Sequence, residues 1–263
     1  MLIGTILNHL FFDAKAAPAE VAQIGQYAEN VFFGKPSGLM DQTASAVGNL
    51  VTIDFFHKDQ PEIRPVSFDF SSCGHALCVI DTGASHADLT DEYAAIPREM
   101  QSVCACFGKE VLTQMEEKAF FAAIPMLREM CGDRAVLRAI HFYQENARVP
   151  KQVAALERGD FEMFLKLVRE SGYSSYMYLQ NVIPAGCKAR QDVAVALALC
   201  EHYLQGKGAC RVHGGGFAGT VQAFVPIEML DTFRAGVDAV LGEGACHVLR
   251  IRPQGGVEME ATE

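Results

Sequence analysis

The sequence predicts an α+β fold, on three observations. Short runs of apolar, β-branched and aromatic residues predict strands at 76–80, 220–225 and 246–251. Stretches with apolar residues at helical spacing occupy most of the chain between residues 90 and 204. One more such stretch, 230–241, separates the last two strands. Helices that alternate in this order with antiparallel strands are typical of an α+β layer.

The N-terminal part is predicted to begin with two helices. Leu2, Ile6 and Leu10 recur at helical spacing with no capping residue before them, so the chain is predicted to start inside a helix. A signal peptide would need a basic start and a small-residue cleavage site, and acidic Asp13 follows instead. A second helix is predicted over residues 19–33. Its buried side would carry Val21, Ile24, Ala28 and Val31.

A carboxylate lies at the start of the third predicted helix, in the segment Gly34-Lys35-Pro36-Ser37-Gly38-Leu39-Met40-Asp41-Gln42. Ser37 is the predicted N-cap, Gly38 lets the backbone approach a ligand, and Gly48 ends the helix. Leu39, Ala44 and Val47 would form its apolar face. Acidic residues are common in first turns for stability alone, so both a catalytic and an ordinary structural role for Asp41 stay open at this point.

The later elements follow a turn-rich stretch. After a strand at 50–56, Pro61 and Pro65 interrupt regular structure, and a domain boundary is predicted there, dividing residues 1–72 from residues 73–263. The continuous apolar run 76–80 predicts a buried strand. Helices are then predicted from Thr90 or Asp91 to Phe107, and at 110–114, 120–130, 135–145, 149–158, 161–170 and 191–204.

A glycine run, Gly214-Gly215-Gly216, separates two predicted strands at 209–212 and 220–225. Dinucleotide-binding and Walker loops need a helix directly after the glycines, so that its N-terminus faces phosphate, and none is predicted here. The run is therefore either a tight hairpin that uses glycine for positive φ, or backbone that lines a binding site.

Composition restricts the class of protein. The chain has 263 residues, of which 50% are hydrophobic, and no apolar run approaches the roughly 20 residues of a membrane helix. Its nine cysteines are scattered, and neither they nor the eight histidines have metal-ligand spacing, so reduced thiols, no metal site and a cytoplasmic location are predicted. A net charge of −10 argues against a nucleic-acid partner.

Three segments together resemble galactokinases, a family of the GHMP small-molecule kinases. The Asp41 segment resembles the family's Gly-x-Pro-Cys-Gly-Ile-Met-Asp-Gln around its catalytic aspartate. Residues 211–219 resemble the third family motif, commonly Arg-Met-Thr-Gly-Gly-Gly-Phe-Gly-Gly. Residues 85–93 keep the family's spacing from a His, here His86, to the Tyr that packs against the sugar, here Tyr93.

This resemblance implies a GHMP kinase fold, with a remnant of the N-terminal domain followed by a ferredoxin-like C-terminal domain. It also implies transfer of a phosphoryl group from ATP, with Mg²⁺, to the anomeric hydroxyl of galactose. The site residues that it implies are Asp41 for catalysis, Gly38, Asp41 and Tyr93 for the sugar, and Gly214, Gly215 and Gly216 as a loop lining the site. Three positions depart from the family pattern: Ser37 replaces the usual Cys, His213 replaces the usual Thr or Ser, and Ala218 replaces a Gly. These differences bear on sugar preference and on the geometry of the loop.

Two family motifs have no counterpart in the sequence: an early segment like Gly-Arg-x-Asn-Leu-Ile-Gly-Glu-His, which supplies the catalytic Arg, and a phosphate loop like Pro-x-x-x-Gly-Leu-Ser-Ser-Ser-Ala. The expectation is a C-terminal portion of a kinase, inactive alone, with its main Mg²⁺ ligands in the missing part and with self-association through the first helix. The alternatives are a non-catalytic sugar-binding or regulatory relative, a relic fragment, or a related kinase acting on N-acetylgalactosamine, arabinose or mevalonate.

Overall fold

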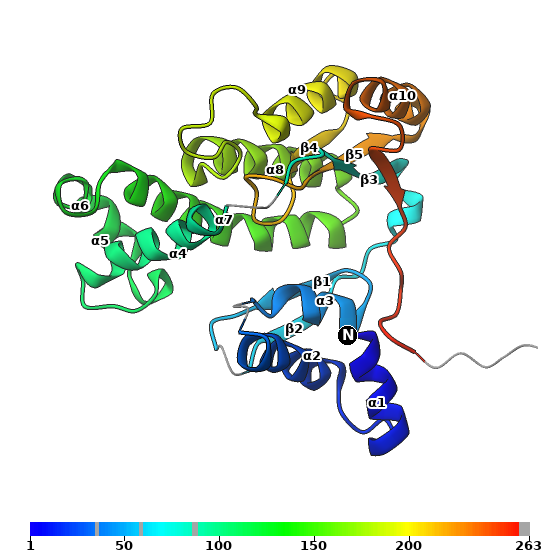
Figure 1. Cartoon of the computed structure of the whole chain (residues 1–263), viewed down its shortest axis with the longest axis horizontal. Helices are drawn as coiled ribbons and strands as arrows, with labels where there is room; N and C mark the ends of the chain where they lie inside the picture. Colours follow the sequence, from blue (N-terminus) through cyan, green and yellow to red (C-terminus); the bar gives the residue numbers. More distant parts are fainter. Residues whose placement is uncertain (35–36, 58–59, 86–88, 258–263) are drawn as a thin grey trace, which may run out of the picture. The chain divides into compact units, whose positions relative to one another are not determined.

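The computed structural model describes residues 1–34, 37–57, 60–85 and 89–257, and its chain divides into two compact units (Figure 1). Unit 1 comprises Met1–Phe68 and Arg250–Glu263, and unit 2 comprises Asp69–Leu249. The C-terminal segment joins unit 1 because it packs on the turn after the third helix, where the Asn49 backbone N–H donates to the Arg252 carbonyl at 2.8 Å. The domain boundary expected between residues 72 and 73 stays a prediction.

Unit 1 holds helices followed by one small sheet. Its elements are α1 (Leu2–Phe12), α2 (Pro18–Tyr27), a π-helical turn η1 (Ala28–Phe32), α3 (Met40–Val47), β1 (Val51–Asp54) and β2 (Glu62–Pro65). The two strands pair antiparallel, with Ile53 opposite Ile63. Strand β2 falls in the stretch predicted to be irregular. Pro65 is its last residue, a place where the missing N–H costs a strand little.

The helices of unit 1 leave much apolar surface uncovered. Helix α1 begins directly after Met1 without a side-chain cap, as the spacing predicted. Its exposed apolar side chains are Leu2, Ile3, Ile6, Leu7, Leu10, Phe11 and Phe12. The buried side predicted for the second helix is partly wrong: Val21 is buried, but Ile24 is 62% exposed and Val31 is 56% exposed. Helix α2 turns Ala22 inward beside Val21 instead.

Unit 2 is built on a four-stranded antiparallel sheet. Its strands are β3 (His75–Asp81), β4 (Ala209–Val212), β5 (Thr220–Pro226) and β6 (Cys246–Leu249), in the order β4-β5-β3-β6. Along β3, Ala76, Cys78 and Ile80 face a core shared with α9 (Asp192–Leu204) and α10 (Leu230–Leu241). Leu77 faces the other way and packs with Phe224 against α8 (Phe161–Ser174). A wholly antiparallel sheet packed against helices confirms the α+β fold (Figure 1).

A helical cluster makes up the rest of unit 2. It contains α4 (Thr90–Ala105), η3 (Leu112–Gln114), α5 (Glu117–Ala122), α6 (Ile124–Cys131), α7 (Asp133–Glu157) and η4 (Ser175–Leu179), and short turns η2 (Phe70–Ser72) and η5 (Ile227–Met229) lie elsewhere in the unit. Helix α7 runs through residues 133–157 unbroken, whereas two helices were predicted. Pro150 lies inside it, and buried Tyr143, Val153 and Leu156 show that packing along its whole length overrides the proline.

The predicted N-cap of α4 is wrong. The N-cap of α4 is Leu89 rather than Thr90 or Asp91. None of the helices in the described part of the chain has the length and apolarity that crossing a bilayer requires.

Candidate active site

Asp41 lies in the first turn of α3, as predicted, and its side chain is exposed. The helix ends at Gly48, also as predicted, where φ is +77°. The predicted apolar face is partly wrong, because Ala44 is exposed while Thr43 and Ala46 are buried. Burial of α3 through this face fixes the direction in which the first turn presents Asp41.

Ser37 does not cap α3. The N-cap residue is Leu39, and it makes no side-chain cap hydrogen bond. The Ser37 hydroxyl donates instead to Asn30 Oδ1 at 3.1 Å, and its backbone N–H donates to the same oxygen at 2.7 Å. Its carbonyl accepts from Gln26 Nε2 at 3.0 Å. Ser37 therefore ties the loop to the preceding helix. Lys35 and Pro36 of the same motif lie outside the described residues.

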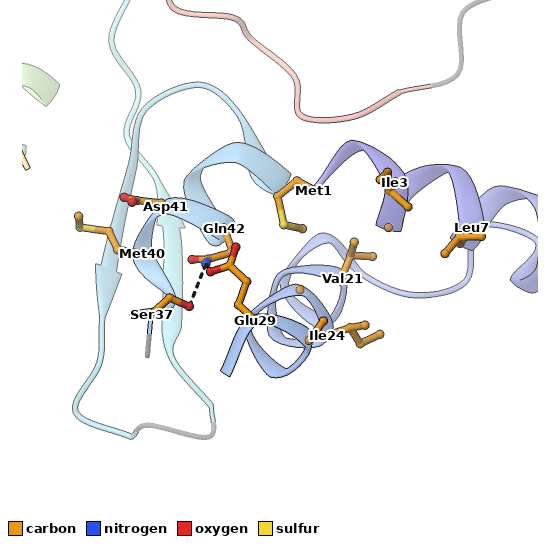
Figure 2. Close-up of a pocket in the computed structure, with 14 residues that line it drawn as sticks. Met1, Ile3, Leu7, Val21, Ile24, Glu29, Ser37, Met40, Asp41 and Gln42 are labelled. Atoms are coloured by element: carbon orange, nitrogen blue, oxygen red, sulfur yellow. Dashed lines mark hydrogen bonds between the residues drawn. The ribbon is translucent and has the colours of Figure 1, made fainter. Parts of the chain in front are cut away.

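A groove of about 860 Å³ runs beside this loop within unit 1. Gly38, Met40, Asp41 and Gln42 line it from the loop and α3, and residues of α1, α2 and η1 line the rest. Figure 2 shows Asp41 and Met40 at one end, with Ile3 and Leu7 of α1 at the other. A Cβ atom at Gly38 would meet nothing within 4 Å, so its backbone is open to a ligand. The groove thus combines two carboxylates, those of Asp41 and Glu29, with a largely apolar wall.

Gln42 adds a polar group to the middle of the groove. Its Nε2 donates to Ser37 Oγ at 3.5 Å and to Glu29 Oε2 at 3.4 Å (Figure 2). Its Oε1 is buried and has no hydrogen-bond partner among the described residues. A buried acceptor without a partner costs roughly 1–3 kcal/mol, and a ligand hydroxyl is a donor that could supply the missing bond.

The glycine run forms the connection between β4 and β5 in unit 2. Gly214 and Gly216 have φ of +70° and +82°, the left-handed region that glycine enters without strain. At Gly216 a Cβ atom would overlap the carbonyl oxygen of Asn181. Asn181 fixes the loop through two hydrogen bonds. Its Nδ2 donates to the Gly215 carbonyl at 3.1 Å, and its own carbonyl accepts from the Phe217 N–H at 2.5 Å.

Tyr93, in the first turn of α4, packs on the same loop. Its hydroxyl donates to the Gly216 carbonyl at 2.7 Å, and its ring meets Phe217 edge-on with centroids 5.5 Å apart. A Cβ atom at Gly215 would come within 2.9 Å of the Tyr93 ring. Burial raises the pKa of the Tyr93 hydroxyl, so it stays a neutral donor at physiological pH. His86, predicted to accompany Tyr93, lies outside the described residues.

A buried polar network supports the strand that leads into the loop. Arg211 of β4 lies with its Nη1 3.8 Å from Glu145 Oε1, and Glu145 also pairs with Arg148. The same Glu145 oxygen accepts from the Ser171 hydroxyl at 2.5 Å. Nearby, His141 Nδ1 lies 2.9 Å from Ser174 Oγ. Burial lowers the pKa of His141, so its ring is neutral at pH 7.

The predicted site residues thus form two groups. Gly38 and Asp41 share the groove in unit 1, and Tyr93 contacts Gly215 and Gly216 in unit 2. Among the described residues, no group of three or more His, Cys, Asp or Glu is arranged to hold a metal ion.

Comparison with known proteins identifies the family. Residues 1–49 match the family model described as GHMP kinases N terminal domain. The galactokinase of Streptomyces coelicolor is 33% identical over 226 residues, which are 84% of this chain and 52% of that enzyme. The galactokinase of Glaesserella parasuis serovar 5 is 31% identical over 219 residues, 82% of this chain and 53% of that enzyme. This chain belongs to the GHMP kinase family. It spans about half the length of the curated relatives it matches.

Solved structures show the GHMP kinase fold independently. Lactococcus lactis galactokinase, in a complex with galactose, aligns with a TM-score of 0.74 and 24% identity, covering 98% of this chain and 65% of that one. Mevalonate kinase of L. major, in a complex with R-mevalonate, aligns with a TM-score of 0.58 and 16% identity over 95% of this chain and 63% of that one. These matches confirm the predicted fold class.

Within this GHMP kinase fold, the sequence interpretation missed Asn181 and Glu145. Neither residue lies in a recognisable motif, and both act on segments distant in the sequence. The sequence contained one indirect signal that such supporting residues exist. A glycine run with positive φ needs neighbours that hold it, but the sequence does not say which residues supply them.

Proposed function

We propose that this chain carries the catalytic carboxylate of a galactokinase, which transfers the terminal phosphoryl group of ATP to the anomeric hydroxyl of galactose. The observation that carries the proposal is the placement of Asp41. It is an exposed first-turn carboxylate beside the open backbone of Gly38, on the wall of a groove of about 860 Å³. The galactokinase relatives and the motif around Asp41 give this groove its chemical interpretation.

The proposed role of Asp41 follows from the chemistry of phosphoryl transfer. The sugar oxygen bonds to phosphorus as the bond to the leaving diphosphate breaks, and the hydroxyl proton must depart. Asp41 orients that hydroxyl and either accepts its proton or favours proton loss electrostatically. Both forms of the role require the carboxylate to face a bound sugar within the groove, as its position on α3 supports.

The remaining site residues have proposed roles in binding. Gly38 would present its backbone to the sugar, and Gln42 Oε1 would accept a sugar hydroxyl. Tyr93 would contact the sugar with its ring, while its hydroxyl holds Gly216 in place. Gly214, Gly215 and Gly216 would line the nucleotide and sugar site. We assign no Mg²⁺ ligand to this chain, because its described residues offer no clustered donor set.

Two assays test the proposal. The chain itself is incubated with ATP, Mg²⁺ and galactose, and formation of galactose 1-phosphate is measured; we expect none above background. The second assay uses a chimera, in which the N-terminal part of the Glaesserella parasuis enzyme that has no counterpart here precedes Met1. The chimera is expected to turn over, and Asp41→Asn is expected to lower its kcat by at least about 10²-fold with little change in KM for ATP.

Asp13→Asn is the matched control, since it removes the same charge from another exposed position of unit 1. Wild-type kcat in the Asp41→Asn chimera would remove Asp41 from the mechanism. A folded chimera that binds galactose without turnover would favour the non-catalytic sugar-binding relative. A substrate panel of N-acetylgalactosamine, arabinose and mevalonate separates the related kinases.

The genomic sequence upstream of Met1 gives an independent check. An in-frame segment encoding Gly-Leu-Ser-Ser-Ser would supply the phosphate loop and support the kinase. Its absence would favour the relic or binding protein.

A further inference from the structure

Two half-buried thiols meet in the helical cluster of unit 2. Cys106 Sγ and Cys131 Sγ lie 3.4 Å apart, although the two residues are 25 positions apart in the sequence. Both thiols also donate toward one acceptor, the Ser102 carbonyl oxygen, at 3.4 and 3.5 Å. The shared acceptor fixes both side chains in an orientation that points them at each other.

The positions of the two residues allow the sulfurs to approach further. Cys106 is the C-cap residue of α4, and Cys131 is the last residue of α6 before Gly132. Helix ends fray and adjust more readily than helix interiors. A disulfide bond is about 2.05 Å long, so the sulfurs need to close by roughly 1.4 Å through rotation of the two side chains and adjustment of the helix ends.

We propose that Cys106 and Cys131 are an oxidative modification site, at which a peroxide converts the two thiols to an intramolecular disulfide. One sulfur attacks a peroxide oxygen, the O–O bond breaks, and a sulfenic acid and one water form. The second thiol then displaces the sulfenic oxygen as a second water. The two sulfurs lose two electrons and two protons in total, and hydrogen peroxide accepts them. This site is independent of the proposed kinase function.

Several other cysteines of unit 2 are more deeply buried than Cys106 and Cys131. Cys78, Cys200, Cys210 and Cys246 are all buried in the core between the sheet and helices α9 and α10. Cys104, two residues before Cys106, is only 1% exposed. Peroxide therefore reaches these thiols less readily than the half-buried pair.

The reaction is slow at neutral pH. Burial and the neighbouring Cys131 thiol raise the pKa of Cys106, and the thiolate is the reactive form. The test therefore treats the folded chain with hydrogen peroxide at about pH 8.5, near the ordinary pKa of cysteine. Remaining thiols are blocked with iodoacetamide before digestion with trypsin.

Trypsin places the two cysteines on separate peptides, residues 99–109 and 129–134. We expect a cross-linked species of these two peptides, two hydrogens lighter than their sum, which dithiothreitol separates. Cys106→Ser and Cys131→Ser should each abolish it. Cys187→Ser, which removes another half-buried thiol of unit 2, should leave it unchanged. Circular dichroism confirms that each variant is folded.

Two results would overturn the proposal. The first is unlinked peptides from the wild-type chain, with both thiols alkylated or separately oxidised. The second is a cross-link that survives Cys106→Ser, because the same peptide also contains Cys104.

Discussion

The Tyr93 hydroxyl donates a hydrogen bond of 2.7 Å to the carbonyl oxygen of Gly216. This bond joins the first turn of α4 to the loop between β4 and β5, segments more than 120 positions apart. It makes Tyr93 a support of the glycine loop as well as a proposed sugar contact. The two roles are separable because one uses the hydroxyl and the other the ring.

Tyr93→Phe should separate them. It keeps the ring contacts with Gly215 and Phe217 but removes the hydrogen bond, so we expect a loss of about 1 kcal/mol in the unfolding free energy of the chain. In the chimera, Tyr93→Ala should raise KM for galactose and leave KM for ATP nearly unchanged. If Tyr93→Ala raised KM for galactose and KM for ATP equally, Tyr93 would act only on folding.

The two outer glycines of the loop make a matched pair for substitution. Both have positive φ, so alanine at either position costs about 1–2 kcal/mol of backbone strain. At Gly214 the added Cβ meets nothing, whereas at Gly216 it overlaps the Asn181 carbonyl. Gly216→Ala should therefore destabilise the chain by more than about 4 kcal/mol or prevent its folding, well beyond Gly214→Ala. Urea unfolding measures both, and equal losses would contradict the packing described for Asn181.

His141 should make the chain less stable in mild acid. Burial holds its pKa below the ordinary value of about 6.5, with Glu145 acting to raise it and Arg211 and Arg148 to lower it. Below pH 6.5 the unfolded chain binds a proton that the folded His141 does not, so stability falls as the pH drops toward the folded pKa. The slope from this one group is at most about 1.4 kcal/mol per pH unit.

His141→Gln should remove this part of the pH dependence. The unfolding free energy of the variant, measured by urea between about pH 7 and 5, should fall less steeply than that of the wild type. His202→Gln, at an exposed position of α9, is the control and should keep the wild-type slope. Parallel curves for the wild type and His141→Gln would show that His141 does not contribute.

Self-association through α1 is our expectation for the isolated chain. Leu10 and Phe11 are 70% and 71% exposed, and contiguous apolar surface of this kind favours association. Light scattering should show assemblies larger than a monomer, and Leu10→Lys combined with Phe11→Lys should reduce them. Val240→Lys, on the exposed side of α10, should not. A monodisperse wild-type monomer would refute the expectation.

Local patterns in the sequence predicted most elements of unit 2. The spacing of apolar residues predicted helix 230–241 with its observed bounds, and the β-branched and aromatic run predicted β5 to within one residue. The glycine run was predicted to connect two strands, and it does. Each of these is a short-range signal, because periodicity and turn residues act within a single element.

The errors arise where distant contacts decide the outcome. Pro150 favours a helix start by local rules, yet α7 continues through it because the whole face is packed. Ser37 has the chemistry of an N-cap, but its hydroxyl and carbonyl form hydrogen bonds with Asn30 and Gln26 instead. Strand β2 forms because it pairs with β1, and no pattern within its own residues predicts this pairing.

The sequence by itself therefore determined the family, the α+β class and the first-turn position of Asp41, since motifs and helical spacing are written in adjacent residues. Only the tertiary structure decided what holds the site. Three features depend on side chains that folding brings together: the hydrogen bonds of Asn181 and Tyr93 to the glycine loop, the Cys106–Cys131 contact, and the Gln42 oxygen, which lacks a partner among the described residues. Hydrogen bonds and van der Waals contacts act over a few ångströms, so their partners are set by the path of the chain in space.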